Sequence, residues 1–195
     1  KVSWVEQVKA TTTEDATYRP QLTNGDATTW KASDSIFHVR TSSVDFSVAT
    51  VFTTSLKSSA WQISTANGSL TRMKSFDPAT GKTSWVEQKK IASTDSDYSV
   101  RGKLEGTDNP FGSEDDLILV QTWDREFNHF GDNPATAGTV ETTFDLRKQK
   151  SKAYQVSTAD GTLTRMKSYD STALLDEAKV SWVEQVKATT TEDAT

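Results

Sequence analysis

The sequence predicts an all-β protein, an antiparallel sandwich or barrel built from two homologous repeats of roughly 90 residues. Residues 60–77 return as residues 153–170 with conservative changes. The pentapeptide Ser-Trp-Val-Glu-Gln occurs three times, at residues 3–7, 84–88 and 181–185. Serine and threonine are abundant while only 34% of residues are hydrophobic, a composition that suits a thin β structure rather than a deep core.

The repeated stretches set the domain boundaries. The first β repeat covers residues 3–83 and the second covers residues 84–180. Apolar positions keep their character between the copies, as where Trp61 is matched by Tyr154. Because shared apolar positions indicate a shared core, we expect the two repeats to pack as one pseudo-symmetric domain.

One hairpin is predicted in each repeat. Asn67-Gly68 and Asp160-Gly161 are dipeptides that favour a type I′ turn between two strands. Good helix formers after Asp170 fit one short helix near residues 171–178, where the first repeat has a Pro/Gly turn. Further strands are predicted at residues 36–41, 46–56, 98–104, 117–123 and 139–146.

The core is expected where apolar residues match between the copies or recur in the pentapeptide. The residues predicted to be buried are Trp4 or its twin Trp182, Trp85, Ile63, Val156, Phe46, Phe127, Leu117 and Leu119.

Residues 1–17 are identical to residues 179–195. Two identical strands would compete for one position in a single fold, so one copy is expected to be swapped onto, or docked on, a neighbouring chain by strand exchange. A head-to-tail exchange of this kind that does not close produces a filament. The alternative is that the duplication marks the boundary of a tandem array or an engineered overlap. The predicted assembly residues are Val2, Trp4, Val5, Val8, Val180, Trp182, Val183 and Val186.

Composition excludes several classes of function. A net charge of −5 argues against nucleic-acid binding, and the lack of cysteine excludes disulfides and thiolate zinc sites. No apolar run has the length of a membrane span, and no Walker, GxGxxG, GxSxG or HExxH motif is present, so no enzyme activity is expected. The leading hypothesis is a structural, self-assembling protein: a surface filament, an adhesin array or a viral shell or tail component. It favours the extracellular surface or a virion as the location.

The rival hypothesis is a β module that binds carbohydrate or another small ligand. Aromatic faces stack on sugar rings, and Trp30 and Trp123 are the tryptophans without an aromatic partner in the other repeat. These two residues are therefore the candidates for ligand stacking.

Two further groups of side chains are candidate sites. The acidic residues Asp108, Glu114, Asp115 and Asp116 offer oxygen ligands of the kind that calcium prefers, although they lack the spacing of an EF-hand and also fit a solvated loop. His38 and His129 align with aliphatic residues of the other repeat, which favours packed histidines over a catalytic base.

Overall fold

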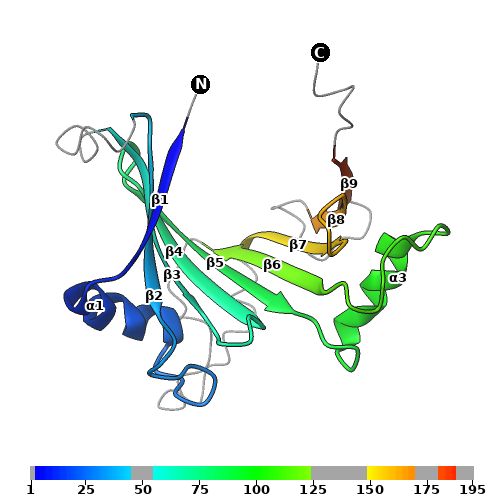
Figure 1. Cartoon of the computed structure of the whole chain (residues 1–195), viewed down its shortest axis with the longest axis horizontal. Coiled ribbons are helices and arrows are strands. Elements are labelled where there is room, and N and C mark those ends of the chain that lie inside the picture. Colours follow the sequence, from blue (N-terminus) through cyan, green and yellow to red (C-terminus); the bar gives the residue numbers. More distant parts are fainter. Residues whose placement is uncertain (1–2, 45–54, 124–148, 170–179, 188–195) are drawn as a thin grey trace. The chain divides into compact units, whose positions relative to one another are not determined.

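The described residues form one open, antiparallel sheet of nine strands in the order β1 to β9 (Figure 1). The computed structural model describes residues 3–44, 55–123, 149–169 and 180–187. Since β1 and β9 each have one neighbour among the described strands, the sheet is open and does not form the closed barrel that the sequence offers as one possibility. The described strands lie in one sheet, and a second sheet that would complete a sandwich is not shown among them. The elements are β1 (Trp4–Lys9), α1 (Thr12–Thr23), β2 (Ile36–Ser42), β3 (Leu56–Ser64), β4 (Leu70–Asp77), β5 (Lys82–Lys90), the 3-10 helix η1 (Ser96–Ser99), α3 (Val100–Glu105), β6 (Leu117–Trp123), β7 (Gln149–Ser157), β8 (Leu163–Tyr169) and β9 (Val180–Val186).

Each predicted hairpin forms at its predicted place, with a different turn. In the β3–β4 hairpin Gly68 has a left-handed φ of 66°, and Asn67 does not share it, so the turn is not type I′. The Gly68 amide donates to the Thr65 carbonyl over 2.8 Å, and the Ser69 amide donates to Asn67 Oδ1 over 3.1 Å. The asparagine therefore holds the turn through its side chain.

The second hairpin, β7–β8, repeats this arrangement. Gly161 has φ 68° and donates to the Thr158 carbonyl over 2.9 Å. The Thr162 amide donates to Asp160 Oδ1 over 3.0 Å. An aspartate thus makes the bond that the asparagine makes in the first hairpin, since both side chains present an acceptor oxygen.

Helix α1 begins in a stretch that the sequence analysis did not assign to a helix. The Thr11 amide donates to Glu14 Oε2 over 2.9 Å and the Glu14 amide donates to Thr11 Oγ1 over 3.3 Å, which is a capping box. Asn24 ends the helix in the left-handed conformation, with φ 52°. The helix presents Tyr18 and Leu22 to the core.

The prediction of a strand at residues 98–104 is wrong. Residues of this stretch form η1 and α3 instead. The buried residues of α3 are Val100, Arg101 and Leu104, and this i, i+1, i+4 spacing fits one face of a helix but not the alternation of a strand. The predicted strand at residues 117–123 is confirmed as β6, whereas the predictions at residues 139–146 and 171–178 lie outside the described residues.

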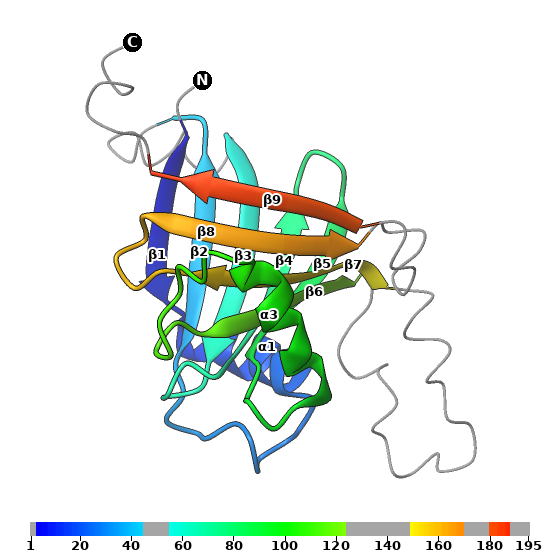
Figure 2. The same ribbon diagram turned by 90° about the vertical axis from the view of Figure 1, so that its right-hand side faces the viewer.

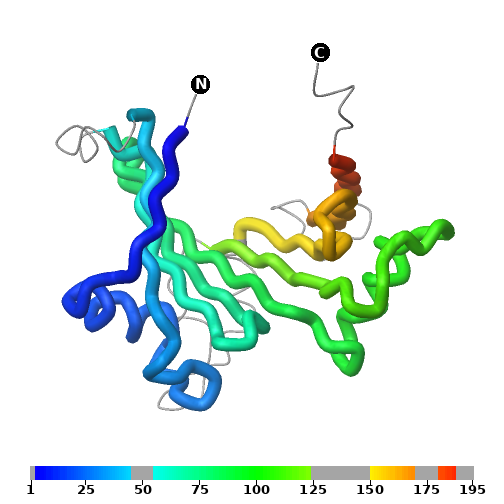
Figure 3. The backbone as a smooth tube through the Cα atoms, in the orientation of Figure 1, coloured from blue at the N-terminus to red at the C-terminus, as the bar shows by residue number. Residues whose placement is uncertain are grey.

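The chain divides into two compact units, each with its own core. Unit 1 comprises Lys1–Glu87 with Thr122–Gln149, and unit 2 comprises Gln88–Gln121 with Lys150–Thr195. In unit 1, strands β1 to β4 follow one another as neighbouring antiparallel strands, which the tube in Figure 3 traces. The core of unit 1 consists of Leu22, Trp30, Ile36, Ile63, Trp85 and Trp123.

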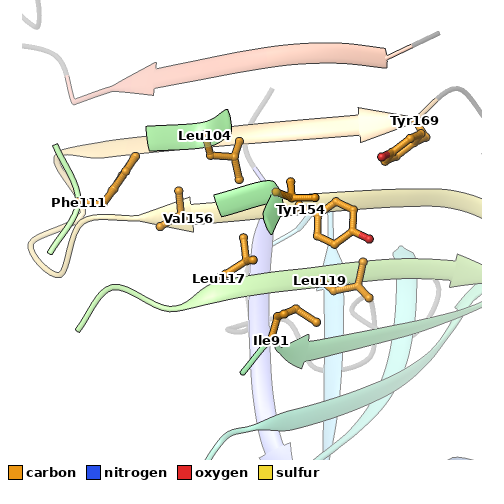
Figure 4. Close-up of a cluster of buried hydrophobic side chains, with 9 residues drawn as sticks. Ile91, Leu104, Phe111, Leu117, Leu119, Tyr154, Val156 and Tyr169 are labelled. Atoms are coloured by element: carbon orange, nitrogen blue, oxygen red, sulfur yellow. The ribbon is translucent and has the colours of Figure 1, made fainter. Parts of the chain in front are cut away.

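In unit 2, strands β7, β8 and β9 lie side by side, with α3 near β8 (Figure 2). Side chains from α3, β6, β7 and β8 meet in its core (Figure 4). That core consists of Ile91, Val100, Leu104, Phe111, Leu117, Leu119, Tyr154, Val156 and Tyr169.

The core prediction is confirmed for the central residues and wrong for the terminal tryptophans. Ile63, Trp85, Leu117, Leu119 and Val156 are buried. Trp4 and Trp182 are exposed large hydrophobic side chains. Phe46 and Phe127 lie outside the described residues.

Candidate functional site

The predicted assembly residues lie on the two outermost strands of the sheet. Trp4, Val5 and Val8 belong to β1, which pairs with β2. Their duplicates Trp182, Val183 and Val186 belong to β9, which pairs with β8. All six are exposed, Val180 packs against the core of unit 2, and Val2 lies outside the described residues.

Both copies of the duplicated segment therefore pair within their own chain. The prediction that two identical strands compete for one position in the fold is wrong, because β1 and β9 occupy opposite ends of the strand order. A single chain has a position for each copy, so any exchange between chains must arise from the exposed edges rather than from a surplus strand.

The three copies of the pentapeptide differ sharply in burial. Trp85 of β5, which has strands β4 and β6 as neighbours, is 2% exposed. Trp4 is 40% exposed and Trp182 is 51% exposed. The same local sequence thus has a buried tryptophan in the interior of the sheet and an exposed tryptophan at both edges. Exposed apolar side chains therefore gather on the two edge strands.

Arg165 of β8 organises the surface beside β9. Its Nε donates to Glu184 Oε2 over 2.7 Å, and its Nη1 donates to the carbonyls of Leu104 over 3.2 Å and Glu105 over 2.8 Å. Asp108 adds two bonds, of 2.9 Å to Nη1 and 2.7 Å to Nη2. The bonds from Arg165 hold the pKa of the Asp108 carboxyl below its usual range. One guanidinium thus connects β8, β9 and the end of α3.

A shallow cavity of about 280 Å³ opens beside β9. It is lined by apolar Leu104, Met166 and Trp182 together with charged Arg165 and Glu184. Lys167 is fully buried, and its Nζ lies 5.5 Å from the centre of the Trp182 ring, a cation–π contact. Trp182 itself is half exposed, so its ring contributes to a mixed apolar and charged surface.

On the opposite edge, Glu6 of β1 forms an ion pair with Arg40 of β2, its direct cross-strand partner. Val8 lies across from His38 in the same register. Because alternate residues of a strand share a face, Trp4, Glu6 and Val8 all face the side of the sheet on which His38 meets α1.

The candidate ligand-stacking residues are part of the core. Trp30 is 4% exposed and Trp123 is 7% exposed, and both pack in the core of unit 1. Their ring faces are occupied by protein, which corrects the expectation that they could stack on a sugar. Trp30 does have an aromatic counterpart, because Arg72 lies over the Trp30 ring as Arg165 lies over the ring of Phe111, another core residue.

The candidate calcium ligands do not gather into one site. Asp108 binds Arg165, Asp116 lies 2.5 Å from Lys90 Nζ, and Asp115 is buried and accepts a bond of 2.9 Å from the Gly112 amide. Glu114 accepts a bond from the neighbouring Ser113. Within the described ranges, no group of three or more acidic or histidine side chains could hold a metal ion. Each carboxylate is used by a protein partner instead.

One polar cluster in unit 1 was missed by the sequence analysis. His38 lies between Ser59 and Glu14, with Nε2 2.6 Å from Ser59 Oγ and Nδ1 2.9 Å from Glu14 Oε1. Burial lowers the pKa of His38, although Glu14 opposes this. A neutral ring fits these partners, with Nδ1 donating to the carboxylate and Nε2 accepting from the hydroxyl.

A serine, a histidine and a carboxylate in this order can activate a nucleophile. Here Ser59 is only 5% exposed, and the Trp61 ring stacks on His38 with 4.7 Å between ring centres. Tyr18 of α1 in turn stacks on Trp61 at 3.8 Å. In this conformation the hydroxyl is closed to a substrate, and the cluster ties α1 to β2 and β3.

The sequence offered one signal for this cluster. The capping box fixes Glu14 at the start of α1, and its bonds from the Thr11 amide hold the pKa of the Glu14 carboxyl below its usual range. The approach of Ser59 to His38 depends on the β2–β3 register, which pairs His38 with Trp61. That register could not be read from the sequence, since the second repeat has Leu119 in place of the histidine.

Comparisons of the chain with profiles of protein families, with characterised proteins and with solved structures give no match. Within the described ranges, no helix is both long and apolar enough to cross a membrane. The geometry of the edges and of the polar clusters is therefore the basis for assigning a function.

Proposed function

We propose that this chain is a non-enzymatic structural protein that assembles from copies of itself through the segment shared by residues 1–17 and 179–195. On this proposal the two units are copies of one β-rich repeat, and filaments, adhesin arrays and viral shells or tails are the kinds of structure that it would build. The observation that carries the proposal is the pair of sequence-identical edge strands that leave Trp4 and Trp182 exposed.

The physical support is the cost of leaving such an edge uncovered. An outer strand has unpaired backbone donors and acceptors, and natural sheets usually protect it with lysines, prolines or bulges. Here the outer strands carry exposed tryptophan and valine, with one exposed lysine, Lys9, at the end of β1. Covering apolar surface stabilises an assembly by about 25 cal/mol per Å², so a contact between edges has a clear driving force.

The experiment is sedimentation velocity of the full chain from about 1 to about 100 µM, a range that brackets ordinary protein association. We expect the sedimentation coefficient to rise with concentration. The matched control is the double variant Trp4→Thr/Trp182→Thr, which keeps β propensity and removes the exposed rings. It should fold as the wild type does and stay monomeric. A double variant that assembles like the wild type would contradict the proposal.

A ligand-binding module is the second candidate. The cavity beside Trp182 favours it, because an open indole face next to Arg165 and Glu184 offers both stacking and hydrogen bonding to a sugar-like ligand. The same sedimentation series separates the two candidates. A binding module keeps the size of a monomer at every concentration, and that result would remove the assembly proposal.

A further inference from the structure

Within the single chain, β9 occupies the position next to β8. β9 pairs with β8 in a register that sets Trp182 opposite Lys167, and Glu184 opposite Arg165. Residues 179–195 have the same sequence as residues 1–17. Every side-chain contact that β9 makes with β8 can therefore be made by β1 of a second copy.

β1 has one neighbour among the described strands. It pairs with β2, whereas β5, which contains the same pentapeptide, pairs with both β4 and β6. The tryptophan of β5 is buried and that of β1 is exposed. The tryptophan of this sequence is thus buried where its strand has a neighbour on each side.

We propose that β1 of a second copy displaces β9 and pairs with β8 in the register of β9, an inference that rests on the proposed function. The junction then contains β8 of one chain followed by β1 and β2 of the next, as β4, β5 and β6 follow one another within the chain. Trp4 takes the place of Trp182 beside Lys167, and Val8 takes the place of Val186 opposite Leu163.

Charge complementarity supports this junction. In the separate chain Glu184 pairs with Arg165 and Glu6 pairs with Arg40. After exchange Glu6 lies between Arg165 of the neighbour and its own Arg40, one carboxylate between two guanidinium groups. A carboxylate has two oxygens and can accept from both arginines.

The exchange conserves backbone pairing. One strand ladder on β8 is lost and an equivalent one is formed, so the number of ladders does not change. Two contributions favour the exchanged state. Trp4 is covered on both sides, and the displaced segment gains conformational entropy. The loss is the freedom of the two chains to move independently, so the exchanged state depends on protein concentration.

The absence of cysteine from the chain allows a direct test by disulfide trapping. Ser168 of β8 pairs with Ser181 of β9, and Ser3 is the duplicate of Ser181. Paired Cα atoms of antiparallel strands lie about 4.5–5.5 Å apart, within the range that a disulfide spans. Oxidised Ser3→Cys/Ser168→Cys protein should form a ladder of covalent multimers on a non-reducing gel.

The matched control for register is Ser3→Cys/Thr164→Cys. Thr164 lies on the same strand and face as Ser168 but four residues away, about 13 Å along β8. We expect at least a tenfold weaker ladder from this variant. Equal ladders from both variants would overturn the proposed register.

A second experiment fixes β9 to β8 with a disulfide. Oxidised Ser168→Cys/Ser181→Cys protein should form an internal disulfide and sediment as a monomer, with at least a tenfold smaller assembled fraction, and reduction should restore assembly. If the wild type assembles while this locked chain also assembles and Ser3→Cys/Ser168→Cys gives no ladder, the edges meet without exchange. This inference then fails and the proposed function stands. A wild type that stays monomeric at every concentration contradicts both.

Discussion

In each unit one strand arginine bonds both to a helix carbonyl and to a glutamate, but the strand that carries the glutamate differs in its position in the sheet. In unit 1 Arg72 of β4 donates to Glu87 Oε2 over 2.7 Å and to the Leu22 carbonyl of α1 over 3.1 Å. In unit 2 Arg165 of β8 makes the matching bonds to Glu184 and to α3. The difference is the strand that carries the glutamate, since β5 is interior and β9 is at the edge.

The polar side chains near this arginine differ between the two units. Unit 1 has the His38 cluster, whereas in unit 2 the Tyr154 hydroxyl donates to Asp97 Oδ2 over 2.7 Å, with Lys152 Nζ 5.0 Å from the Tyr154 ring centre. Both units therefore have the bond from the arginine to a helix carbonyl, while the neighbouring side-chain network differs between them.

The largest expected effect comes from removing the tryptophan of the interior copy of the pentapeptide, compared with removing that of an edge copy. Trp85→Ala should lower the free energy of unfolding by about 3–5 kcal/mol, because it empties a core position. Trp182→Ala should cost within about 1 kcal/mol, since half of the ring faces solvent. Urea unfolding of dilute protein measures both values. Equal losses would mean that β9 is covered in solution even at low concentration.

The arginine anchors provide the next largest effect. Arg72→Met should lower the free energy of unfolding by about 1.5–3 kcal/mol, the range for hydrogen bonds to charged groups, because it leaves Glu87 and the end of α1 without this donor. Arg165→Met should cost less, because Glu184 and Asp108 are more exposed to water than Glu87. Urea unfolding again gives the measurement, and a larger loss at Arg165 would contradict the comparison.

The smallest expected effect is a difference in pH dependence. Burial lowers the pKa of His38, so the unfolded chain binds the proton more readily and stability falls as the pH drops below about 6.5. The charged groups near the ring are Glu14, Arg40 and Glu6, of which the two carboxylates oppose the shift and Arg40 adds to it. His38→Leu introduces the residue of unit 2 and should flatten the stability profile between about pH 7 and pH 5.

Thermal unfolding across this pH range checks the effect of His38→Leu. Ser59→Ala is the matched control, because it removes the hydroxyl partner and leaves the titrating ring in place. It should keep the slope that His38→Leu removes. A variant His38→Leu with an unchanged slope would show that other groups cause the pH dependence.

The confirmed predictions concern features that are decided by residues close together in the sequence. The hairpin turns at Gly68 and Gly161 formed at the predicted positions because glycine accepts the left-handed backbone that each turn requires. Strand β6 agrees with its predicted bounds. Helices α1 and α3 were not predicted, although Thr11 followed three residues later by Glu14 is a capping box that can be read from the sequence.

The positions of the two hairpin turns follow from the amino-acid sequence alone, because they depend on the backbone preferences of a few adjacent residues. The burial of the pentapeptide depends instead on tertiary structure. Trp4, Trp85 and Trp182 share one local sequence, and a buried ring in β5 becomes an exposed ring in β1 and β9. The reason is that covering a strand depends on the presence of a neighbour on each side, which no local sequence specifies.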